Sequence, residues 1–202
     1  MRIRHWISVL GLLVGCSAAP HAEIATYDFG MPRANNPAPP RLPVALTLAP
    51  VAAAPWLGGS DIVYRLAYED SARPRAYSLS RWVAPPGALF TQRLQQRLDS
   101  SGAIAGTNDG VTTPYLLRMD LEEFSQVFDA PDSSRALVRV RATLIDATGR
   151  TLVAQQTFTV ERPVTGSNAA GAVRSLRDAS DGAVDSLLEW LGGELNRIAK
   201  SR

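Results

Sequence analysis

The sequence predicts an α+β fold in which a twisted antiparallel sheet carries two helices packed on one face. Three segments between residues 117 and 160 alternate apolar and polar side chains, as strands with one covered face do. The C-terminal segment has apolar side chains at helical spacing, so it forms an amphipathic helix that can cover the sheet.

The first half of the chain predicts three strands and one helix. Apolar runs at 42–51, 61–68 and 75–82 are typical of strands, and a polar turn separates the last two. A proline pair at 85–86 then opens a helix. Proline lacks an N–H group, and in the first helical turn that group would have no intrahelical partner anyway. The predicted helix has an apolar stripe at four-residue spacing: Phe90, Leu94 and Leu98.

The second half predicts three further strands, at 117–122, 138–144 and 152–160. After Glu122 and Glu123 the apolar phase shifts to Phe124 and Phe128, which indicates a β-bulge. A hairpin turn at 146–150 joins the last two strands.

The covering helix is expected to begin after Ser167 or Asn168, either of which can cap it. Its apolar positions keep mostly three- and four-residue spacing: Val173, Leu176, Val184, Leu187, Leu191 and Leu195. Gly192 and Gly193 favour an early end of this helix.

Residues 1–15 have the three-part layout of a secretory signal peptide, with a basic start, an apolar stretch at 6–14 and a small residue at the cut. The apolar stretch is shorter than the roughly 20 residues that span a bilayer. Leu13-Val14-Gly15-Cys16 resembles a lipobox, at which bacterial lipoproteins are acylated and cleaved. Cys16 is the only cysteine, so a covalent lipid on Cys16 is predicted, with an ordinary signal peptide as the alternative.

Cleavage would leave a lipidated N-terminus and proline-rich linker at 16–41, followed by a single α+β domain at 42–202. Within the linker, Tyr27-Asp28-Phe29-Gly30 is a candidate for a short edge strand. Ser17 occupies the position where aspartate would signal inner-membrane retention, so the periplasmic leaflet of the outer membrane is the expected location. The periplasmic side of the inner membrane is the alternative.

The composition argues against several functions. Removing Arg2 and Arg4 with the signal leaves 19 of the 21 basic residues against 19 acidic ones, which gives no basis for nucleic-acid binding. His5 lies in the signal and His21 in the linker, so neither a histidine-based catalytic triad nor a Cys/His metal site is expected in the domain. The sequence has no phosphate-binding glycine loop.

The remaining polar candidates each have a simpler explanation. Glu122 and Glu123 are adjacent on a strand, and a strand edge in water explains them without catalysis. Asp129 and Asp132 flank Pro131 in a loop, where turn formation explains them. Two alternating arginines could bind a phosphate head group but are typical of a solvated face paired with acids: Arg139 and Arg141.

The tryptophans are the candidates for contact surfaces. Trp56 and Leu57 precede two glycines in a loop and are predicted either to bind a partner or to fold back onto the core. Trp82, just before the first helix, is expected in the core, whereas Trp190 on the C-terminal helix fits either surface or core.

The order of these motifs resembles one known family. The motifs are Leu13-Val14-Gly15-Cys16, Tyr27-Asp28-Phe29, Val44 to Val51, Pro55-Trp56-Leu57, Ile62-Val63-Tyr64-Arg65, Ser80-Arg81-Trp82, Leu94 with Leu98, and Glu123-Phe124. The chain is similar to the ABC-type transport auxiliary lipoproteins, which are accessory to MCE-type lipid transporters. It departs from the family at 83–86, where an acidic residue and a leucine are expected after Trp82.

The resemblance implies a non-enzymatic accessory protein without a cofactor, working beside an ABC permease, an ATPase and an MCE-domain protein. Its substrates would be phospholipids, sterols or other hydrophobic molecules. One hypothesis is a protein-binding module that docks the MCE protein to the outer membrane. This module could act as a single copy or as a homo-oligomer. The alternatives are a domain that itself binds lipid between sheet and helices, and a structural envelope lipoprotein.

Overall fold

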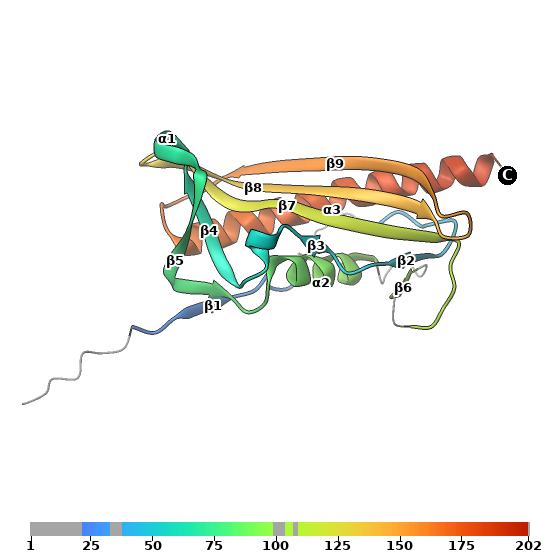
Figure 1. Cartoon of the computed structure of the whole chain (residues 1–202), viewed down its shortest axis with the longest axis horizontal. Coiled ribbons are helices and arrows are strands. Elements are labelled where there is room, and N and C mark those ends of the chain that lie inside the picture. The colour runs from blue at the N-terminus through green and yellow to red at the C-terminus, as the bar shows by residue number, and fades with distance from the viewer. Residues whose placement is uncertain (1–21, 33–37, 99–103, 107–108, 202) are drawn as a thin grey trace, which may run out of the picture.

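The computed structural model describes residues 22–32, 38–98, 104–106 and 109–201, which form one curved sheet and its covering helices (Figure 1). The α+β class is confirmed. In chain order the elements are β1 Ala25–Tyr27, β2 Leu46–Leu48, β3 Ala52–Ala53, the 3₁₀ turn η1 Pro55–Leu57, β4 Asp61–Leu66, α1 Ala67–Asp70, β5 Ser71–Trp82, α2 Pro86–Leu98, β6 Ile104–Gly106, β7 Tyr115–Ala130, β8 Ser133–Asp146, β9 Thr151–Pro163 and α3 Ala169–Lys200.

The long antiparallel meander β7–β8–β9 forms one side of the sheet, with β9 at its edge and the shorter strands joined to β7. Alternation sends Leu117, Met119 and Leu121 toward the helices, and all three are buried. The register of β7 against β8 shifts between Leu121 and Glu123, which confirms the predicted bulge. Beyond the bulge, Phe124 takes up the inward position.

The sheet is mixed, where an antiparallel sheet was expected. β2, β3 and β4 all run parallel to β7, while β4 and β5 are antiparallel. A parallel return needs a long crossover, and the connection from β4 to β7 contains one in α2. β2, β3 and β4 have only two to six residues, too few for a sustained alternation, so their direction left little trace in the sequence.

Helix α3 is longer than expected. Gly192 and Gly193 do not end it, and it continues to Lys200. At its start the side-chain carbonyl of Asn168 accepts a hydrogen bond from the Gly171 N–H at 2.9 Å, which confirms this residue as the cap. A Cβ on Gly182 would lie 2.8 Å from the Arg162 guanidinium, so glycine at this position allows α3 to approach β9 closely.

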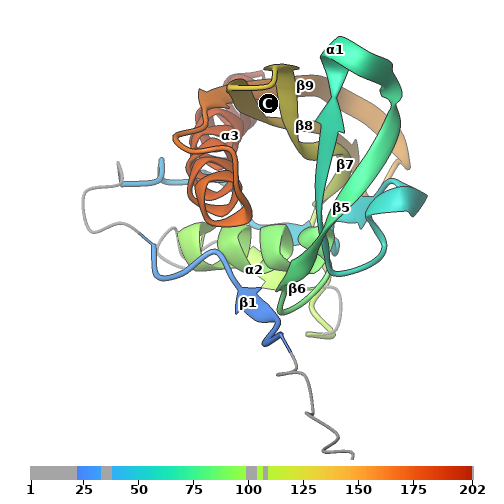
Figure 2. The same cartoon turned by 90° about the vertical axis from the view of Figure 1, so that its left-hand side faces the viewer.

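Helices α2 and α3 lie on the same side of the curved sheet, and the core fills the space between (Figure 2). The segment predicted as a linker contributes to this core. An edge strand does pair with β5, but it is β1 at Ala25–Tyr27, whereas 27–30 was expected. The Phe29 side chain, just after β1, is buried against Trp82 and Phe124 at centroid distances of 5.7 and 5.8 Å. The packed domain therefore includes residues before 42, since β1 pairs with the sheet and Phe29 belongs to the core.

Two ion pairs join α2 to α3. The Arg93 and Asp181 side chains, 1% and 5% exposed, are 3.4 Å apart, and Arg97 donates to Asp185 at 2.5 Å. Arg93 also donates to the main-chain carbonyls of Phe29 and Gly30 at 2.5 and 2.8 Å. Burial lowers the pKa of Arg93, and the Asp181 charge opposes that change. One guanidinium thus holds two helices and the N-terminal segment together.

Replacing Arg93→Met should lower the free energy of unfolding by about 3–5 kcal/mol, because it removes the cation facing a buried carboxylate. The double variant Arg93→Met/Asp181→Leu should recover most of that loss. Arg97→Met is the matched control, and it should cost about 1 kcal/mol because Asp185 is partly solvated. Urea unfolding measures all three, and equal losses for Arg93→Met and Arg97→Met would contradict the assignment.

Candidate functional site

The structure separates the two residues that were predicted to form a contact pair. Leu57 is 2% exposed and belongs to the core, so it is unavailable to a partner. Trp56, its neighbour in η1, is 37% exposed. A single 3₁₀ turn therefore anchors the loop through one side chain and presents the other to solvent, and only Trp56 remains a candidate for contact.

Trp56 is held in place by Arg65 of β4. The Arg65 guanidinium carbon lies 4.7 Å from the centre of the indole ring, which is cation–π geometry. The same guanidinium is 3.5 Å from the Glu123 carboxylate and donates to the Ser71 carbonyl at 3.2 Å. The orientation of this half-exposed tryptophan is thus fixed from beneath, as in a rigid aromatic anchor.

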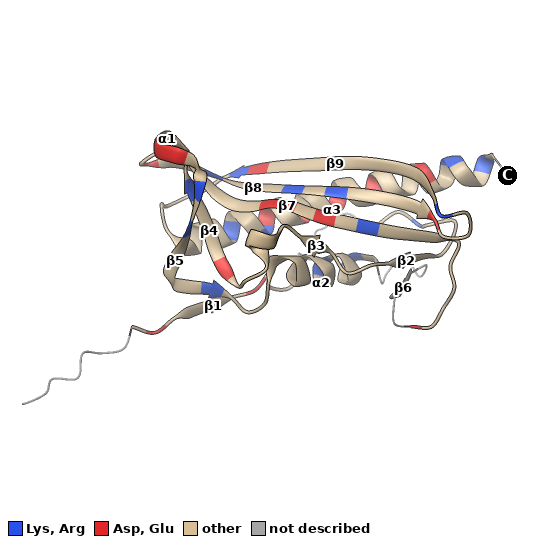
Figure 3. Cartoon of the chain, viewed as in Figure 1, with Lys and Arg blue, Asp and Glu red and all other residues tan. Residues whose placement is uncertain are grey.

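Glu122 and Glu123 lie at the bulge and pair with different arginines. Glu123 contacts Arg65, whereas Glu122 is 3.1 Å from Arg141, which also reaches Asp120 at 3.4 Å. The expected reading of Arg141 as one member of a solvated, acid-paired face is confirmed. Figure 3 shows positive and negative positions side by side along the middle of β7 and β8.

Arg139 lies on this face as well, opposite Glu123 in the register, and its side chain donates to the Thr159 hydroxyl at 3.3 Å. We call this surface the outer-face cluster: Trp56, Arg65, Asp120, Glu122, Glu123, Arg139 and Arg141. The sequence indicated most of its members separately. Arg65 was missed as a functional residue, and its only signal was a charge in the otherwise apolar end of β4.

The other sequence candidates lie elsewhere. Asp129 is paired with Arg135 across the β7–β8 hairpin, and this hydrogen bond is the main reason why the pKa of Arg135 is raised. Asp132 lies in the exposed turn of that hairpin. Trp82 is in the core, as expected.

Trp190 lies between surface and core. It is partly buried and packs edge-on against Phe158, with 5.9 Å between ring centroids. The two rings line an open groove of about 530 Å³ between β9 and α3, together with polar residues such as Gln156 and Glu189. Such a mixed lining differs from the mainly apolar walls of small-molecule sites.

Within the described ranges, no group of histidine, cysteine or acidic side chains is arranged to hold a metal ion. The helices of the same ranges include none with the length and apolarity needed to cross a bilayer. Cys16 and the predicted signal peptide 1–15 lie outside the described residues, so lipidation stays a prediction.

Tyr77 of β5 is the titratable group with the clearest shift. Its hydroxyl donates to the Gln126 side-chain carbonyl at 2.6 Å, and its ring is 4.8 Å from that of Tyr64. Burial, with a smaller contribution from Tyr64, raises the pKa of Tyr77 to about 12. The neutral phenol therefore fixes β5 against the buried part of β7.

The family described as ABC-type transport auxiliary lipoprotein component matches residues 27–187, which is most of the chain. The chain belongs to this family. The match begins at Tyr27, in agreement with the structural role of β1 and Phe29, and includes the outer-face cluster.

Solved structures support the same fold for this auxiliary lipoprotein. A Xanthomonas campestris protein of family DUF330 is similar at a TM-score of 0.77 and 21% identity, covering 87% of this chain and 99% of its own. An uncharacterized protein is similar at a TM-score of 0.64 and 13% identity, covering 84% and 99%. At these identities the likeness shows the fold alone. The sequence matches none of the curated proteins with which it was compared.

Membership gives the auxiliary lipoprotein a coarse role. It is a component that accompanies an ABC-type transport system, and a lipoprotein is held at a membrane on its periplasmic side. The family is one of transport components and not of enzymes.

Alkaline pH should destabilise this protein partly through Tyr77. The unfolded chain loses the phenolic proton near pH 10 while the folded chain keeps it to about pH 12, so the free energy of unfolding falls as pH rises through that interval. The loss is on the order of 1–2 kcal/mol. Urea unfolding at pH 9 and pH 11.5 should give this loss of free energy for wild type and for Tyr68→Phe, a control at an exposed tyrosine. The loss should be smaller for Tyr77→Phe. An unchanged slope in Tyr77→Phe would contradict the assignment.

Proposed function

We propose that this auxiliary lipoprotein is a non-enzymatic periplasmic component that docks an MCE-domain substrate-binding protein to the outer membrane through its lipid anchor. The single observation that carries the proposal is the family match over residues 27–187. The transport system would supply the ATPase and the permease, and this chain would supply a tether and a binding surface.

The outer-face cluster supports a protein-binding role. Protein interfaces are enriched in tryptophan and arginine, and Trp56 is a half-exposed ring resting on Arg65. The paired charges around it at the bulge, Glu122 with Arg141, form a polar rim that can exchange partners with an opposing surface.

The alternative of a lipid-binding domain has less support. It requires a cleft between the sheet and the helices, yet among the described residues this space is filled by core side chains such as Leu94, Met119 and Leu187. The groove beside Trp190 is open and has a mixed polar lining, which suits an acyl chain poorly.

Lipidation is tested by metabolic labelling with palmitate, which should be lost in Cys16→Ala because no other cysteine exists in the chain. The protein should leave the membrane fraction at the same time. Ser17→Asp should keep the label but move the protein from the outer to the inner membrane fraction. Persistent labelling of Cys16→Ala would exclude the anchor, and an unchanged fraction for Ser17→Asp would exclude the proposed sorting.

Docking is tested by crosslinking the lipidated protein in envelopes and identifying what is recovered with it by mass spectrometry. The expected partners are an MCE-domain protein and its permease. Trp56→Ala should reduce their recovery about tenfold or more, as the loss of an interface anchor does. Leu152→Ala, at an exposed apolar residue of β9, is the matched control and should leave recovery unchanged. Recovery of self-crosslinked copies alone would contradict the docking role.

A further inference from the structure

Three exposed apolar side chains gather at the edge of the sheet formed by β1 and β5. Ile24, Leu79 and Val83 are 43%, 52% and 58% exposed. Ala25 of β1 pairs with Ser80 of β5, so Ile24 and Leu79 stand one residue before the same pair. Val83 donates its N–H to the Tyr27 carbonyl at 2.8 Å, at the other end of the pairing. We call these three residues the edge patch.

The edge patch is not part of the core. Ser80 and Trp82 of β5 are buried, so Leu79 and Arg81 point to the opposite face, and Val83, the first residue after β5, is exposed beyond the end of the strand. Single exposed apolar residues are ordinary, but three of them along one short edge of a sheet offer a contact surface.

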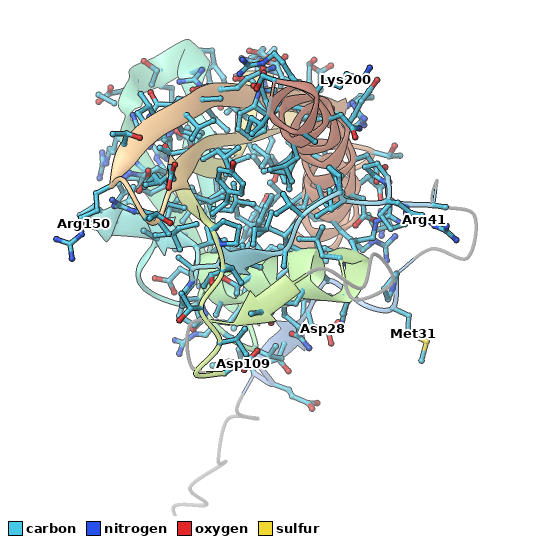
Figure 4. The ribbon with its side chains drawn as sticks, turned by 90° about the vertical axis from the view of Figure 1, so that its right-hand side faces the viewer. Asp28, Met31, Arg41, Asp109, Arg150 and Lys200 are labelled. Atoms are coloured by element: carbon cyan, nitrogen blue, oxygen red, sulfur yellow. The ribbon has the colours of Figure 1, made fainter. Side chains whose placement is uncertain are left out.

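The position of the edge patch in the chain indicates what it binds. Eight peptide steps separate Cys16 from Ile24, and an extended chain spans at most about 3.5 Å per step, so Ile24 lies within about 28 Å of the lipidated sulfur. β1 lies at one end of the long axis of the molecule, and the β8–β9 hairpin lies at the other (Figure 1). Figure 4 shows Asp28 and Met31, just after β1, projecting from one side of the body and Arg150 of the hairpin from another.

Charges of both signs surround the edge patch: Glu23 and Asp28 flank β1, and Arg174 and Arg177 of α3 line a hollow with Val83. Arg81 stands between Leu79 and Val83 and is flanked in the register by Thr26 of β1 and by Asp61 of β4. Such a mixture of acidic and basic side chains gives no strong attraction for an anionic surface. Binding at this edge would therefore depend on apolar side chains, with Arg81 at head-group level.

We propose that the edge patch rests on the phospholipid bilayer that carries the Cys16 lipid, with Ile24, Leu79 and Val83 inserted at the level of the head groups. The proposal rests on the lipid anchor of the proposed function. It adds a second contact to the acyl chains and so sets the orientation of the domain, with the β8–β9 hairpin directed away from the membrane.

The test uses the full-length lipidated protein in vesicles of phosphatidylethanolamine and phosphatidylglycerol. Because acylation consumes the Cys16 sulfur, Val83→Cys and Leu152→Cys each offer one free thiol for an environment-sensitive NBD label. The label at 83 should emit at shorter wavelength with vesicles and lose intensity when the lipids carry doxyl groups. The label at 152, an exposed apolar residue at the start of β9, should do neither. Leu79→Cys repeats the measurement should Val83→Cys fold poorly.

The outcomes separate this proposal from the anchor on which it rests. Vesicle-bound protein whose labels at 79 and 83 keep aqueous emission and escape quenching would overturn the edge contact and leave the anchor intact. Equal quenching at 83 and 152 would overturn it as well, since the domain would then have no fixed orientation. Wild-type protein that takes up the label at Cys16 and fails to float with vesicles would overturn the anchor and this proposal together.

Discussion

The buried guanidinium of Arg93 is the constraint on which the arrangement of this protein depends. Moving a charge out of water is costly, and a structure tolerates it only when the charge has a partner and its hydrogen bonds are made. Arg93 has its charge partner in Asp181 of α3, and one of its terminal nitrogens donates to the carbonyls of both Phe29 and Gly30. The ion pair places α2 beside α3, and the carbonyl contacts fix the N-terminal segment on top of α2.

This arrangement has a consequence for the other side of the sheet. Both helices are held on one face of the β7–β9 meander, so its opposite face is left to solvent and carries the charges (Figure 3). The bulge after Leu121 then decides where those charges meet, because it turns Glu122 toward Arg141 and Glu123 toward Arg65. The position of Trp56 over Arg65 follows from the same bulge, since it depends on the Glu123 partner of that arginine.

The parts of the fold that could be predicted are those with a long and regular pattern. β7 and α3 have 16 and 32 residues, long enough for their apolar and polar side chains to show a clear period. The strand, its bulge and the helix could therefore be predicted. β2 and β3 have three and two residues, too few for a period, and their parallel direction depends on the crossover through α2. The burial of Arg93 could not be predicted from the sequence, because a buried arginine is recognisable only once Asp181, far away in sequence, is placed beside it. Leu57 and Trp56 are neighbours with opposite roles, and no periodicity applies within a single 3₁₀ turn.

The same burial that fixes the N-terminal segment limits how the protein can act at a membrane. A free 26-residue linker at 16–41 would have a root-mean-square reach of roughly 28 Å and would let the domain take any orientation. Pairing of β1 with β5 and burial of Phe29 remove most of that freedom, since fixed backbone begins before residue 30. A surface such as the outer-face cluster is then held at a restricted distance from the anchor, which raises its effective concentration toward a partner at the same membrane. The aromatic contact of Phe29 with Trp82 therefore determines not only stability but also the volume in which this domain can meet its partner.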